Sequence, residues 1–511
     1  MMKEARKRQI VLILILSVLV LVCLIVEAGR EEVKDHKTKI VQKEKEEQHE
    51  GEKKKEKRKK KKVEEETNVR VLLMTSRFAS LFHRTVKVTS SKPFTVEVNG
   101  KAKQYDAGDS VEYSAGNSRL KKKKIVITPA EGAKLKVLSV TRQNIHPSYR
   151  RTLQVTWNKK GLLLMNKLPL EEYLYAVVPS ELSTSSKMDA LKAQAVCARS
   201  YAYQQMQSAR YDKYHADLDD SVACQVYNNI PEDSRSRKAV NSTKGMVLTN
   251  KKGAVIQVYY YSTSWGYSAS GQDVWNTPSK VSYLKECFQI TEKSRKKSGV
   301  QSLNLSQEQN FENFINSSYY DTYDSDSAWY RWSVVISQKS LSERIDAAIA
   351  SCYASDPTLV LTQKKNGGYA RKPLKPLGAL KKIRVEKREN SGLVTELVLV
   401  GKKNVIKICT QYNIRKVLAP VYEQVSYNDG KSKTSMSLLP SAAFYVANAV
   451  KDDEAAFEFV GGGFGHGAGM SQCGAEKMAK LGKNYQEILL HYFAGTKIMS
   501  LKKVKKADAR Q

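Results

Sequence analysis

One glutamate, Glu181, is the residue in this 511-residue chain whose position best suits acid–base chemistry. It lies in the segment Val178–Ser183, at the end of a short strand-like run and just before a segment of strongly helical composition, 187–205. A carboxyl group held at the mouth of a helix, facing a cleft, can give up a proton and later take one back. The alternative is an acidic side chain in an ordinary turn, favoured there by the helix dipole. The spacing alone leaves both interpretations open.

A glycine-rich segment, 461–469, contains His466 and runs into a predicted helix. It fits neither the dinucleotide fingerprint nor the P-loop pattern. Backbone amides exposed at the start of a helix can bind oxyanions or sugar oxygens. We therefore expect a ligand-binding loop, and the alternative is a tight turn that holds a structural histidine.

A hydroxyl-rich segment, 262–264, follows a predicted strand and precedes Gly266. It lacks the G-x-S-x-G pattern of a serine hydrolase. We interpret these hydroxyls as hydrogen-bonding groups for a polar substrate, with ordinary turn serines as the alternative. The neighbouring aromatic residues Trp265, Tyr267 and Trp275 could stack on sugar rings or belong to the core.

The histidines and cysteines do not form a recognisable metal site. His215 and Cys224 are close in sequence, but a zinc site needs three or four ligands, so we predict no metal and no other cofactor. The six cysteines beyond residue 30 are scattered and form no C-x-x-C pair, so we expect mostly free, buried thiols.

The elements that must position these groups start with short strands, expected at 69–74, 86–89, 94–98, 124–128, 153–157 and 162–170. Asn99-Gly100 is a strong hairpin signal. A short helix over 171–178 leads to Glu181, and Ser185 or Ser186 is the expected N-cap of the next helix. Further along we expect a hairpin over 246–261, a helix at 341–350, strands at 383–387 and 393–400, and helices at 470–481 and 485–492.

These elements predict a mixed α+β fold with a β-rich N-terminal region and an α+β catalytic region that forms a cleft. The predicted organisation is a membrane anchor (1–30), a charged disordered tether (31–67), a β-rich domain (68–150), the catalytic region (151–290), a mixed α/β second region (291–440), and the glycine-rich loop with helices that complete the site (441–500).

The first residues indicate export. Basic residues precede an apolar run, 10–26, which is about as long as a minimal membrane span. Because such basic residues stay inside, the rest of the chain is placed outside. We expect an uncleaved single-pass anchor in the cell membrane with the catalytic part on the extracytoplasmic side, and a cleaved signal peptide is the alternative.

The charge of the chain points to an anionic partner. The net charge is +34, and residues 67–511 carry 67 basic and 38 acidic residues, a net of +29, so the folded part is itself basic. Outside a membrane, cell-wall polymers are the expected partner. The predicted topology argues against nucleic acid.

Four segments together resemble the SpoIID/LytB family of bacterial cell-wall proteins. They are Leu168–Glu181 (LPLEEYLYAVVPSE), Ala190–Tyr201 (ALKAQAVCARSY), Tyr261–Tyr267 (YSTSWGY) with Asp273–Trp275, and Gly463–Ala475 (GFGHGAGMSQCGA). The similarity spans about residues 150–497 with the segments in the family's order.

The resemblance implies a lytic transglycosylase that cleaves the glycan strands of peptidoglycan during sporulation, at engulfment. Glu181 would be its catalytic acid and base, leaving 1,6-anhydro-N-acetylmuramic acid ends. An amidase or endopeptidase of the SpoIIP type and a membrane complex would be its partners. The alternative is a non-catalytic, LytB-like wall-binding protein that enhances an amidase.

The same resemblance implies substrate-binding residues within the matched segments. They are Gln194, Arg199, Ser262, Ser264, Gly266, Tyr267, Gly465, His466, Gly467, Gly469, Ser471 and Gln472. Some relatives bind zinc through a His/Cys cluster after the helix, of which residues 215–224 keep only parts. Cys473 stands where the family often has a tyrosine.

Overall fold

A computed structural model describes residues 67–228, 231–278 and 281–504. The predicted anchor, its apolar run 10–26 and the charged tether up to residue 66 lie outside these residues. Contacts divide the chain into residues 1–68 and 69–511, and the description below concerns the second unit. In the described ranges, no helix combines the length and the apolar character that crossing a membrane requires.

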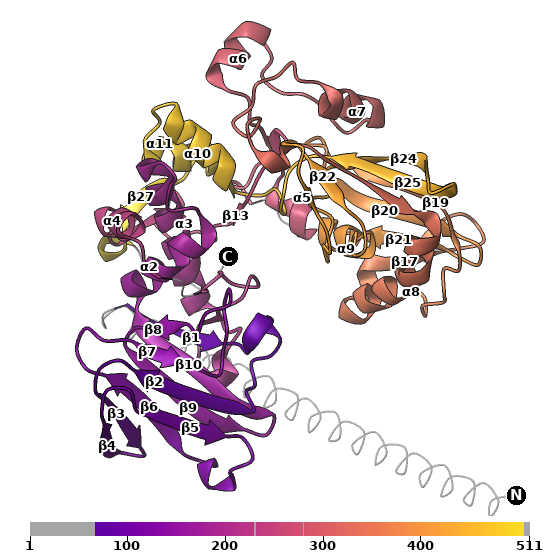
Figure 1. Ribbon diagram of the computed structural model, residues 1–511. Helices are drawn as coiled ribbons and strands as arrows, with labels where there is room; N and C mark the ends of the chain where they lie inside the picture. The colour runs from indigo at the N-terminus through magenta and orange to yellow at the C-terminus, as the bar shows by residue number, and fades with distance from the viewer. Residues whose placement is uncertain (1–66, 229–230, 279–280, 505–511) are drawn as a thin grey trace, which may run out of the picture. The chain divides into compact units, whose positions relative to one another are not determined.

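The fold is α+β, as predicted, and begins with a seven-stranded sheet in the order β11-β1-β10-β9-β6-β3-β4 (Figure 1). Its strands are β1 Asn68–Leu73, β3 Phe94–Val98, β4 Lys101–Tyr105, β6 Lys124–Pro129, β9 Thr152–Asn158, β10 Gly161–Pro169 and β11 Leu218–Asp219. The β3–β4 hairpin turns at Asn99 and Gly100, which have φ angles of 48° and 85°, so the hairpin prediction is confirmed.

A four-stranded sheet packs with the first one. Its order is β5-β2-β7-β8, with β5 Ser110–Ser114, β2 Thr85–Ser90, β7 Leu135–Val137 and β8 Ser148–Tyr149. Alternate residues such as Val88, Val96, Ile127 and Val155 are buried in one shared core, which gives the strands their in–out periodicity. We call the two sheets together the N-terminal β module.

The segment before Glu181 is helical, which confirms the short helix expected over 171–178 and corrects the description of this run as strand-like. Helix α2, Leu170–Glu181, continues directly from β10 and includes Pro179 in its last turns. The apolar run that suggested a strand is one buried face of this helix, packed on the β module. Helix α3, Met188–Gln207, has Lys187 as its N-cap without a side-chain bond, so neither Ser185 nor Ser186 caps it.

The hairpin expected over 246–261 forms over a short length, where Thr249 bridges to Val255 and the Ile256 amide donates to the Leu248 carbonyl at 3.0 Å. Strand β12, Met246–Thr249, ends in a turn in which the Asn250 amide donates to the Ala254 carbonyl. Its partner strand, however, is β27, Lys497–Ser500. Strand β13, Tyr260–Tyr261, pairs instead in parallel with β26, Met470–Ser471, because the C-terminal segment returns to this region.

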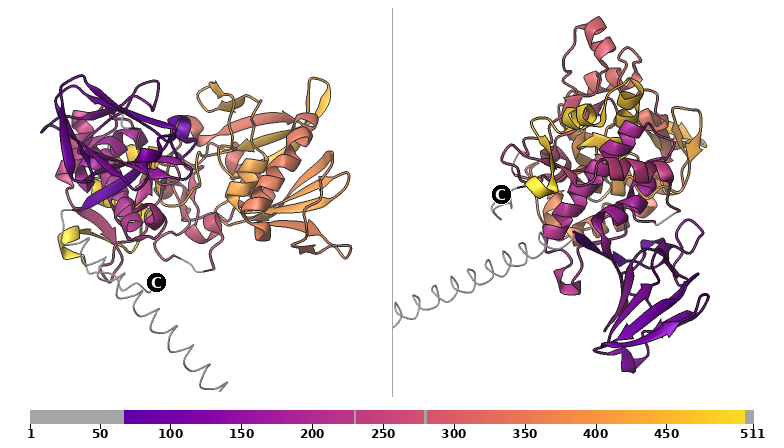
Figure 2. Two further views of the ribbon diagram at one scale, coloured as in Figure 1. Left: turned by 90° about the horizontal axis from the view of Figure 1, so that it is seen from below. Right: turned by 90° about the vertical axis from the view of Figure 1, so that its left-hand side faces the viewer.

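The C-terminal helices end up beside α3, far from it in sequence (Figures 1 and 2). They are α10, Gln472–Lys480, and α11, Tyr485–Tyr492, and their predicted positions are confirmed within two residues. Helix α4, Ser234–Ser242, contacts α2 and α3. The short helices α5, α6 and α7 are Gly271–Trp275, Glu292–Ser298 and Glu308–Asn316.

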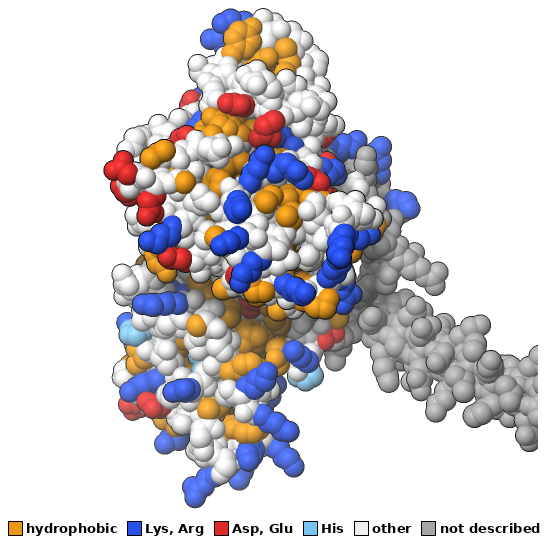
Figure 3. Space-filling view, turned by 90° about the vertical axis from the view of Figure 1, so that its right-hand side faces the viewer, with side chains coloured by type: hydrophobic (Ala, Val, Ile, Leu, Met, Phe, Trp, Pro, Cys, Tyr) orange, Lys and Arg blue, Asp and Glu red, His pale blue; other side chains and the backbone are white. Residues whose placement is uncertain are grey.

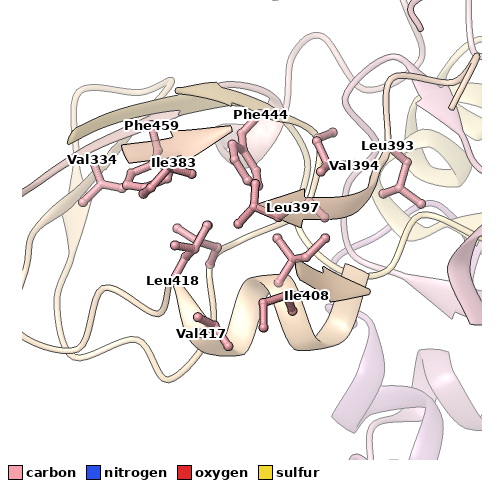
Figure 4. Close-up of a cluster of buried hydrophobic side chains, with 14 of the residues drawn as sticks. Val334, Ile383, Leu393, Val394, Leu397, Ile408, Val417, Leu418, Phe444 and Phe459 are labelled. Carbon is pink, nitrogen blue, oxygen red and sulfur yellow. The ribbon is translucent and has the colours of Figure 1, made fainter. Parts of the chain in front are cut away.

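Two further five-stranded sheets share a second apolar core (Figure 4). One has the order β23-β22-β16-β25-β24 and the other β18-β17-β21-β20-β19. Their strands are β16 Trp332–Ser337, β17 Val360–Gln363, β18 Tyr369–Ala370, β19 Leu380–Arg388, β20 Val394–Gly401, β21 Val405–Cys409, β22 Val425–Tyr427, β23 Ser432–Lys433, β24 Phe444–Lys451 and β25 Glu454–Gly461. Helices α8, Gln338–Ser355, and α9, Gln411–Val417, pack on them.

Candidate functional site

Glu181 is the last residue of α2, and local hydrogen bonds keep this end of the helix in place. Pro179 has no N–H to donate within the helix. The Ser180 hydroxyl donates to the Ala176 carbonyl at 2.7 Å, and the Leu182 amide donates to the Val178 carbonyl at 3.0 Å. The chain therefore stays helical to Glu181 and turns away directly after it.

The Glu181 carboxyl group is half-buried among hydrogen-bond donors from three other segments. The Val226 amide donates to its Oε1 at 2.8 Å, and the Tyr260 hydroxyl and the Gln472 side chain also bond to it. Gln472 Nε2 donates to the Glu181 backbone carbonyl at 3.0 Å as well. We call Glu181, Val226, Tyr260 and Gln472 the Glu181 site.

Burial sets the proton affinity of this carboxyl group. It raises the pKa of Glu181 from 4.5 to about 7, although the three donors act in the opposite direction. A carboxyl group with such a pKa exists in both protonation states near neutral pH. That is the property a group needs to act first as an acid and then as a base.

Tyr260 is itself fixed by a second layer of hydrogen bonds. Gln225 Nε2 donates to the Tyr260 hydroxyl oxygen at 3.1 Å, and Gln225 Oε1 accepts from the Tyr173 hydroxyl at 3.3 Å. Because the amide N–H points at the phenol oxygen, the phenol proton is directed to Glu181. Sequence reasoning missed Tyr260; the available signal was its position two residues before the hydroxyl-rich segment.

His466 bonds to the backbone of Tyr260, and both of its ring nitrogens form hydrogen bonds within the protein. Its Nδ1 accepts from the Ala468 amide at 3.1 Å, so Nε2 carries the proton that it donates to the Tyr260 carbonyl at 3.1 Å. Burial lowers the pKa of His466 to about 4, so the ring is neutral at physiological pH. This geometry favours a structural role that fixes the backbone of Tyr260.

The first amides of the glycine-rich loop are used within the protein. The amides of Gly462, Gly463, Phe464 and Gly465 donate to backbone carbonyls of the protein. The glycines instead permit close packing: a Cβ on Gly469, where φ is 81°, would lie 2.1 Å from the Tyr259 carbonyl oxygen. The loop thereby packs directly against the segment that carries Tyr260.

A second buried carboxyl group, Asp324, joins the hydroxyl-rich segment to the C-terminal signature. Its oxygens accept from the amide and the hydroxyl of Ser264, at 3.0 and 2.6 Å, from the Ser471 hydroxyl and from the Gly474 amide. Gly474 is required here because a Cβ would lie 2.9 Å from Asp324 Oδ2 and 2.1 Å from the Tyr492 hydroxyl. We call Asp324, Ser264, Ser471 and Gly474 the Asp324 hub.

The Asp324 hub is enclosed by protein, and burial raises the pKa of Asp324 from 3.8 to about 6. Nothing in the sequence marked this residue, since it lies in a polar stretch without a motif. Ser264 and Ser471, predicted to bind substrate, are both fully buried against it. Their hydroxyls hold two chain segments together.

Arg199 is enclosed as well. Its guanidinium group bonds to both carboxyl oxygens of Glu171, at 2.9 and 2.6 Å, and to the carbonyls of Met246 and Val240. The side chain has no exposed surface. Arg199 therefore fastens α3 to the start of α2, and the structure gives it no surface that faces a ligand.

The other predicted residues divide into two groups. Gln194 is buried beside the Glu181 site, with its Oε1 3.5 Å from Gln472 Nε2 and its own Nε2 without a hydrogen-bond partner among the described residues. Ser262 is half-buried and its carbonyl accepts from the Cys473 amide at 3.0 Å, next to Gln472. Of these two, Ser262 keeps exposed surface, whereas Gln194 is fully buried.

Four more residues are committed to packing or to backbone contacts. Gly266 contacts Phe314 closely, since a Cβ there would lie 2.8 Å from that ring, and the Tyr267 hydroxyl donates to the Leu303 carbonyl at 2.9 Å. Gly467 is buried under Trp265, and Gly465 is half-buried over Tyr261. The structure thus gathers Glu181, Gln472, Gln194 and Ser262, and leaves Arg199, Gly266 and Tyr267 outside the Glu181 site.

Metal ligands are not grouped in the part of the chain that the structure describes: no three His, Cys, Asp or Glu side chains lie together as they would around an ion. His215 adopts a left-handed turn with φ of 55°, and the Cys224 thiol is 3.7 Å from an Arg210 nitrogen. The six described cysteines are free thiols, and Cys197 and Cys352 are the buried ones.

Comparison with known proteins places two domains in the chain. Residues 158–250 match the family model described as a stage II sporulation protein, which covers α2, α3 and Glu181. Residues 269–358 and 356–469 match a domain of unknown function, which covers the second apolar core and Asp324. Asp324 lies in the second match, and its partners Ser264, Ser471 and Gly474 lie just outside both matches.

Three relatives are similar to this chain over different lengths. An amidase enhancer of Bacillus subtilis is 28% identical over 333 residues, 64% of this chain and 40% of that protein. An uncharacterised protein of Brachyspira hyodysenteriae is 25% identical over 435 residues, 82% of this chain and 94% of that one. Stage II sporulation protein D of Bacillus subtilis is 34% identical over 135 residues, 24% of this chain and 38% of that one.

These matches confirm the resemblance and support the assignment of the chain to the SpoIID/LytB family. The chain spans about 40% of the length of the amidase enhancer and 38% of the stage II sporulation protein D that it matches.

Proposed function

We propose that the protein acts at the bacterial cell wall as a lytic transglycosylase on peptidoglycan glycan strands. The matches to the stage II sporulation model and to an amidase enhancer support the cell-wall role. The observation that carries the enzymatic role is the half-buried Glu181 carboxyl group, whose pKa burial raises to about 7.

The proposed reaction needs one carboxyl group and no added water. Protonated Glu181 donates its proton to the oxygen that links N-acetylmuramic acid to the next sugar, and the bond from C1 to that oxygen breaks. The C6 hydroxyl of the same muramic acid then attacks C1, and its proton passes to the Glu181 carboxylate. The products are a free hydroxyl on the leaving sugar and a 1,6-anhydro ring, with Glu181 protonated again. Ordinary glycosidases use two carboxyl groups, because there a second carboxylate either activates a water molecule or attacks C1 itself.

The neighbours of Glu181 have separate parts in this reaction. Val226 and Tyr260 donate hydrogen bonds to the carboxyl group, so they hold its orientation and stabilise the carboxylate that follows proton donation. Gln472 holds the backbone of Glu181. Ser262 is the remaining candidate for a contact to the sugar, whereas Gln194 is fully buried beside Gln472.

We further propose that residues 10–26 anchor the protein in the cell membrane and that the described part works outside the cell, in sporulation at engulfment. An amidase or endopeptidase of the SpoIIP type, within a membrane complex, would prepare its substrate by removing the peptides. The basic composition of residues 67–511 supports an anionic partner outside the cell.

Product analysis tests the enzymatic role. Purified protein incubated with peptide-free glycan strands should produce 1,6-anhydro ends, detected by mass spectrometry of the released fragments. Hydrated reducing ends would show a hydrolase instead. Intact strands under conditions in which the protein binds them would contradict the enzymatic proposal.

A second function is favoured by one observation, the 333-residue match to the amidase enhancer, which is the longest of the matches to relatives with a functional name. In that case the protein binds the wall without cleaving it and accelerates an amidase. An amidase assay with intact peptidoglycan separates the two: an enhancer raises the amidase rate equally with and without the Glu181 carboxyl group.

A further inference from the structure

The end of the N-terminal β module that lies farthest from α2 carries a concentration of positive charge. Three chain segments meet there: the β3–β4 turn, the loop before β6 and the β9–β10 turn. Their basic residues are Lys101, Arg119, Lys121, Lys122, Lys123, Lys124, Lys159 and Lys160, and all eight side chains are exposed. We call this group the basic end.

The topology brings these segments together. The Lys124 amide donates to Asn99 Oδ1 at 3.1 Å, which joins the β3–β4 turn to the start of β6. Trp157 Nε1 donates to the Ala115 carbonyl at 3.1 Å, which joins β9 to the same loop. Lys124 is also in register with Thr156, just before the β9–β10 turn. Figure 3 shows Lys and Arg side chains gathered at the lower end of this module.

Acidic residues balance only a small part of this charge: one exposed carboxylate, Glu97 on β3 opposite Val126, lies near the eight basic residues. The sequence contains no Asp or Glu between Glu112 and Glu131, and none between Glu131 and Glu171. Within the part of the chain that the structure describes, none of these eight residues forms an ion pair. Glu112 pairs with Lys87 instead. Like charges held together raise the local potential, so the basic end attracts anions more strongly than scattered lysines do.

The dimensions of the basic end suit a chain rather than a compact anion. The charges extend across five neighbouring strands in the order β4-β3-β6-β9-β10. At about 4.8 Å per strand this is a width of roughly 19 Å. Lysines act as mobile point charges, whereas arginine forks select one phosphate or carboxylate geometry. Seven of the eight residues are lysines, which favours a repeating, flexible polyanion.

The aromatic residues at the basic end have lysines over their faces. Lys121 Nζ lies 5.3 Å from the ring centre of Trp157, and Lys160 Nζ lies 5.8 Å from that of Phe82. Proteins that bind single-stranded nucleic acid offer open aromatic faces on which the bases stack. Covered rings favour a polymer without bases.

From these observations we infer that the basic end is a second binding surface, which holds a linear phosphodiester polymer without bases, separate from the Glu181 site. Strand β10 runs between them for nine residues, about 30 Å of extended chain. The surface would keep the protein on an anionic wall polymer while the Glu181 site engages its own substrate. This inference does not depend on the proposed enzymatic activity.

Binding of poly(glycerol phosphate) to the full chain tests the inference. The variant K121S/K122S/K123S/K124S removes four charges from the basic end. Its matched control, K381S/K382S/K402S/K403S, removes four exposed lysines from β19 and the β20–β21 turn. Circular dichroism checks that both variants are folded.

We expect the basic-end variant to bind at least about tenfold more weakly at 100 mM salt, and its slope of log K against log salt to fall by about 3. The control should bind within about twofold of the unmutated protein. Equal loss in both variants would show diffuse charge and overturn the inference. So would tighter binding to a single-stranded oligonucleotide of equal charge, or to phosphatidylglycerol vesicles.

Discussion

Two carboxyl groups of this protein, Glu181 and Asp324, have a raised pKa but differ in their exposure to solvent and in their hydrogen-bond partners. Burial raises the pKa of both Glu181 and Asp324, to about 7 and about 6. Asp324 is enclosed, and four donors from Ser264, Ser471 and Gly474 occupy its oxygens. Glu181 is half-buried at the end of a helix, and its donors leave it partly open to solvent.

The difference shows that a raised pKa does not by itself identify an acid–base catalyst. A catalytic carboxyl group must also exchange its proton with something that arrives, which Asp324 cannot do while it is surrounded by its own chain. Asp324 connects the hydroxyl-rich segment, through Ser264, to the C-terminal signature, through Ser471. This contact also helps to position Glu181. Ser471 is held by Asp324, and the next residue, Gln472, donates to the Glu181 backbone carbonyl.

Replacement of Arg199 should have the largest effect on stability. Arg199, like Asp324, is a charged group enclosed by the protein. Arg199→Ala leaves Glu171 without its partner, so we expect the free energy of unfolding to fall by about 3–5 kcal/mol in denaturant titrations. The double variant Glu171→Gln/Arg199→Met should recover part of that loss. If Arg199→Ala were as stable as the unmutated protein but bound glycan strands more weakly, Arg199 would belong to the binding site after all.

The stability of the protein should depend on pH through Asp324. The pKa of Asp324 is higher in the folded state, about 6, than its ordinary value of 3.8. The folded state therefore binds this proton more tightly, and Asp324 lowers stability by roughly 3 kcal/mol as pH rises from about 4 to 6. Glu181, whose pKa is also raised, adds a loss in the same direction up to about pH 7. Urea titrations across this range measure the change.

Asp324→Asn provides the control for that measurement. The amide cannot ionise, so this variant should lose the part of the pH dependence that lies between pH 4 and 6, although it is less stable at every pH because one oxygen becomes an N–H donor facing other donors. An unchanged pH dependence in the variant would assign the effect to another group.

Removal of the Tyr260 hydroxyl should have a smaller effect, confined to the Glu181 site. The hydroxyl lowers the pKa of Glu181, so in Tyr260→Phe that pKa rises. The proposed enzyme needs protonated Glu181 to begin, and its activity should fall as pH rises through about 7. In Tyr260→Phe this fall should shift to higher pH, and the maximal rate should drop about tenfold, since a hydrogen bond to a charged group contributes about 1.5 kcal/mol.

Tyr173→Phe is the matched comparison, because it removes a hydroxyl one step further away, on Gln225. It should leave the position of the pH limb unchanged. An identical shift in both variants would indicate a general disturbance of the fold and would contradict a specific bond between Tyr260 and Glu181.

Much of this architecture could be predicted from the sequence because the signals are local. The Asn99-Gly100 turn, the alternating strands of the N-terminal β module, helix α11 and the order of the family motifs depend on neighbouring residues. Glu181 was found in the same way, and the segment before it had been described both as a strand-like run and as a short helix, of which the helix is correct. Packing on the β module decides in favour of a helix there, despite Pro179.

The remainder depends on contacts between distant segments. Tyr260 and Asp324 have no motif of their own, and only the parallel pairing of β13 with β26 brings the first beside the C-terminal signature. The roles of Arg199, Ser264 and Ser471 differ from expectation for the same reason: partners far away in sequence, Glu171 and Asp324, occupy their polar groups.

The most direct measurement compares Glu181→Gln with Glu172→Gln on peptide-free glycan strands. Both changes replace a carboxylate on α2 by an amide, but Glu172 forms an ion pair with the exposed Arg151, away from the Glu181 site. We predict that Glu181→Gln lowers the formation of 1,6-anhydro ends by about 10²- to 10⁴-fold, with strand binding retained, and that Glu172→Gln keeps the rate. Anhydro ends formed at the unmutated rate by folded Glu181→Gln protein would contradict the account.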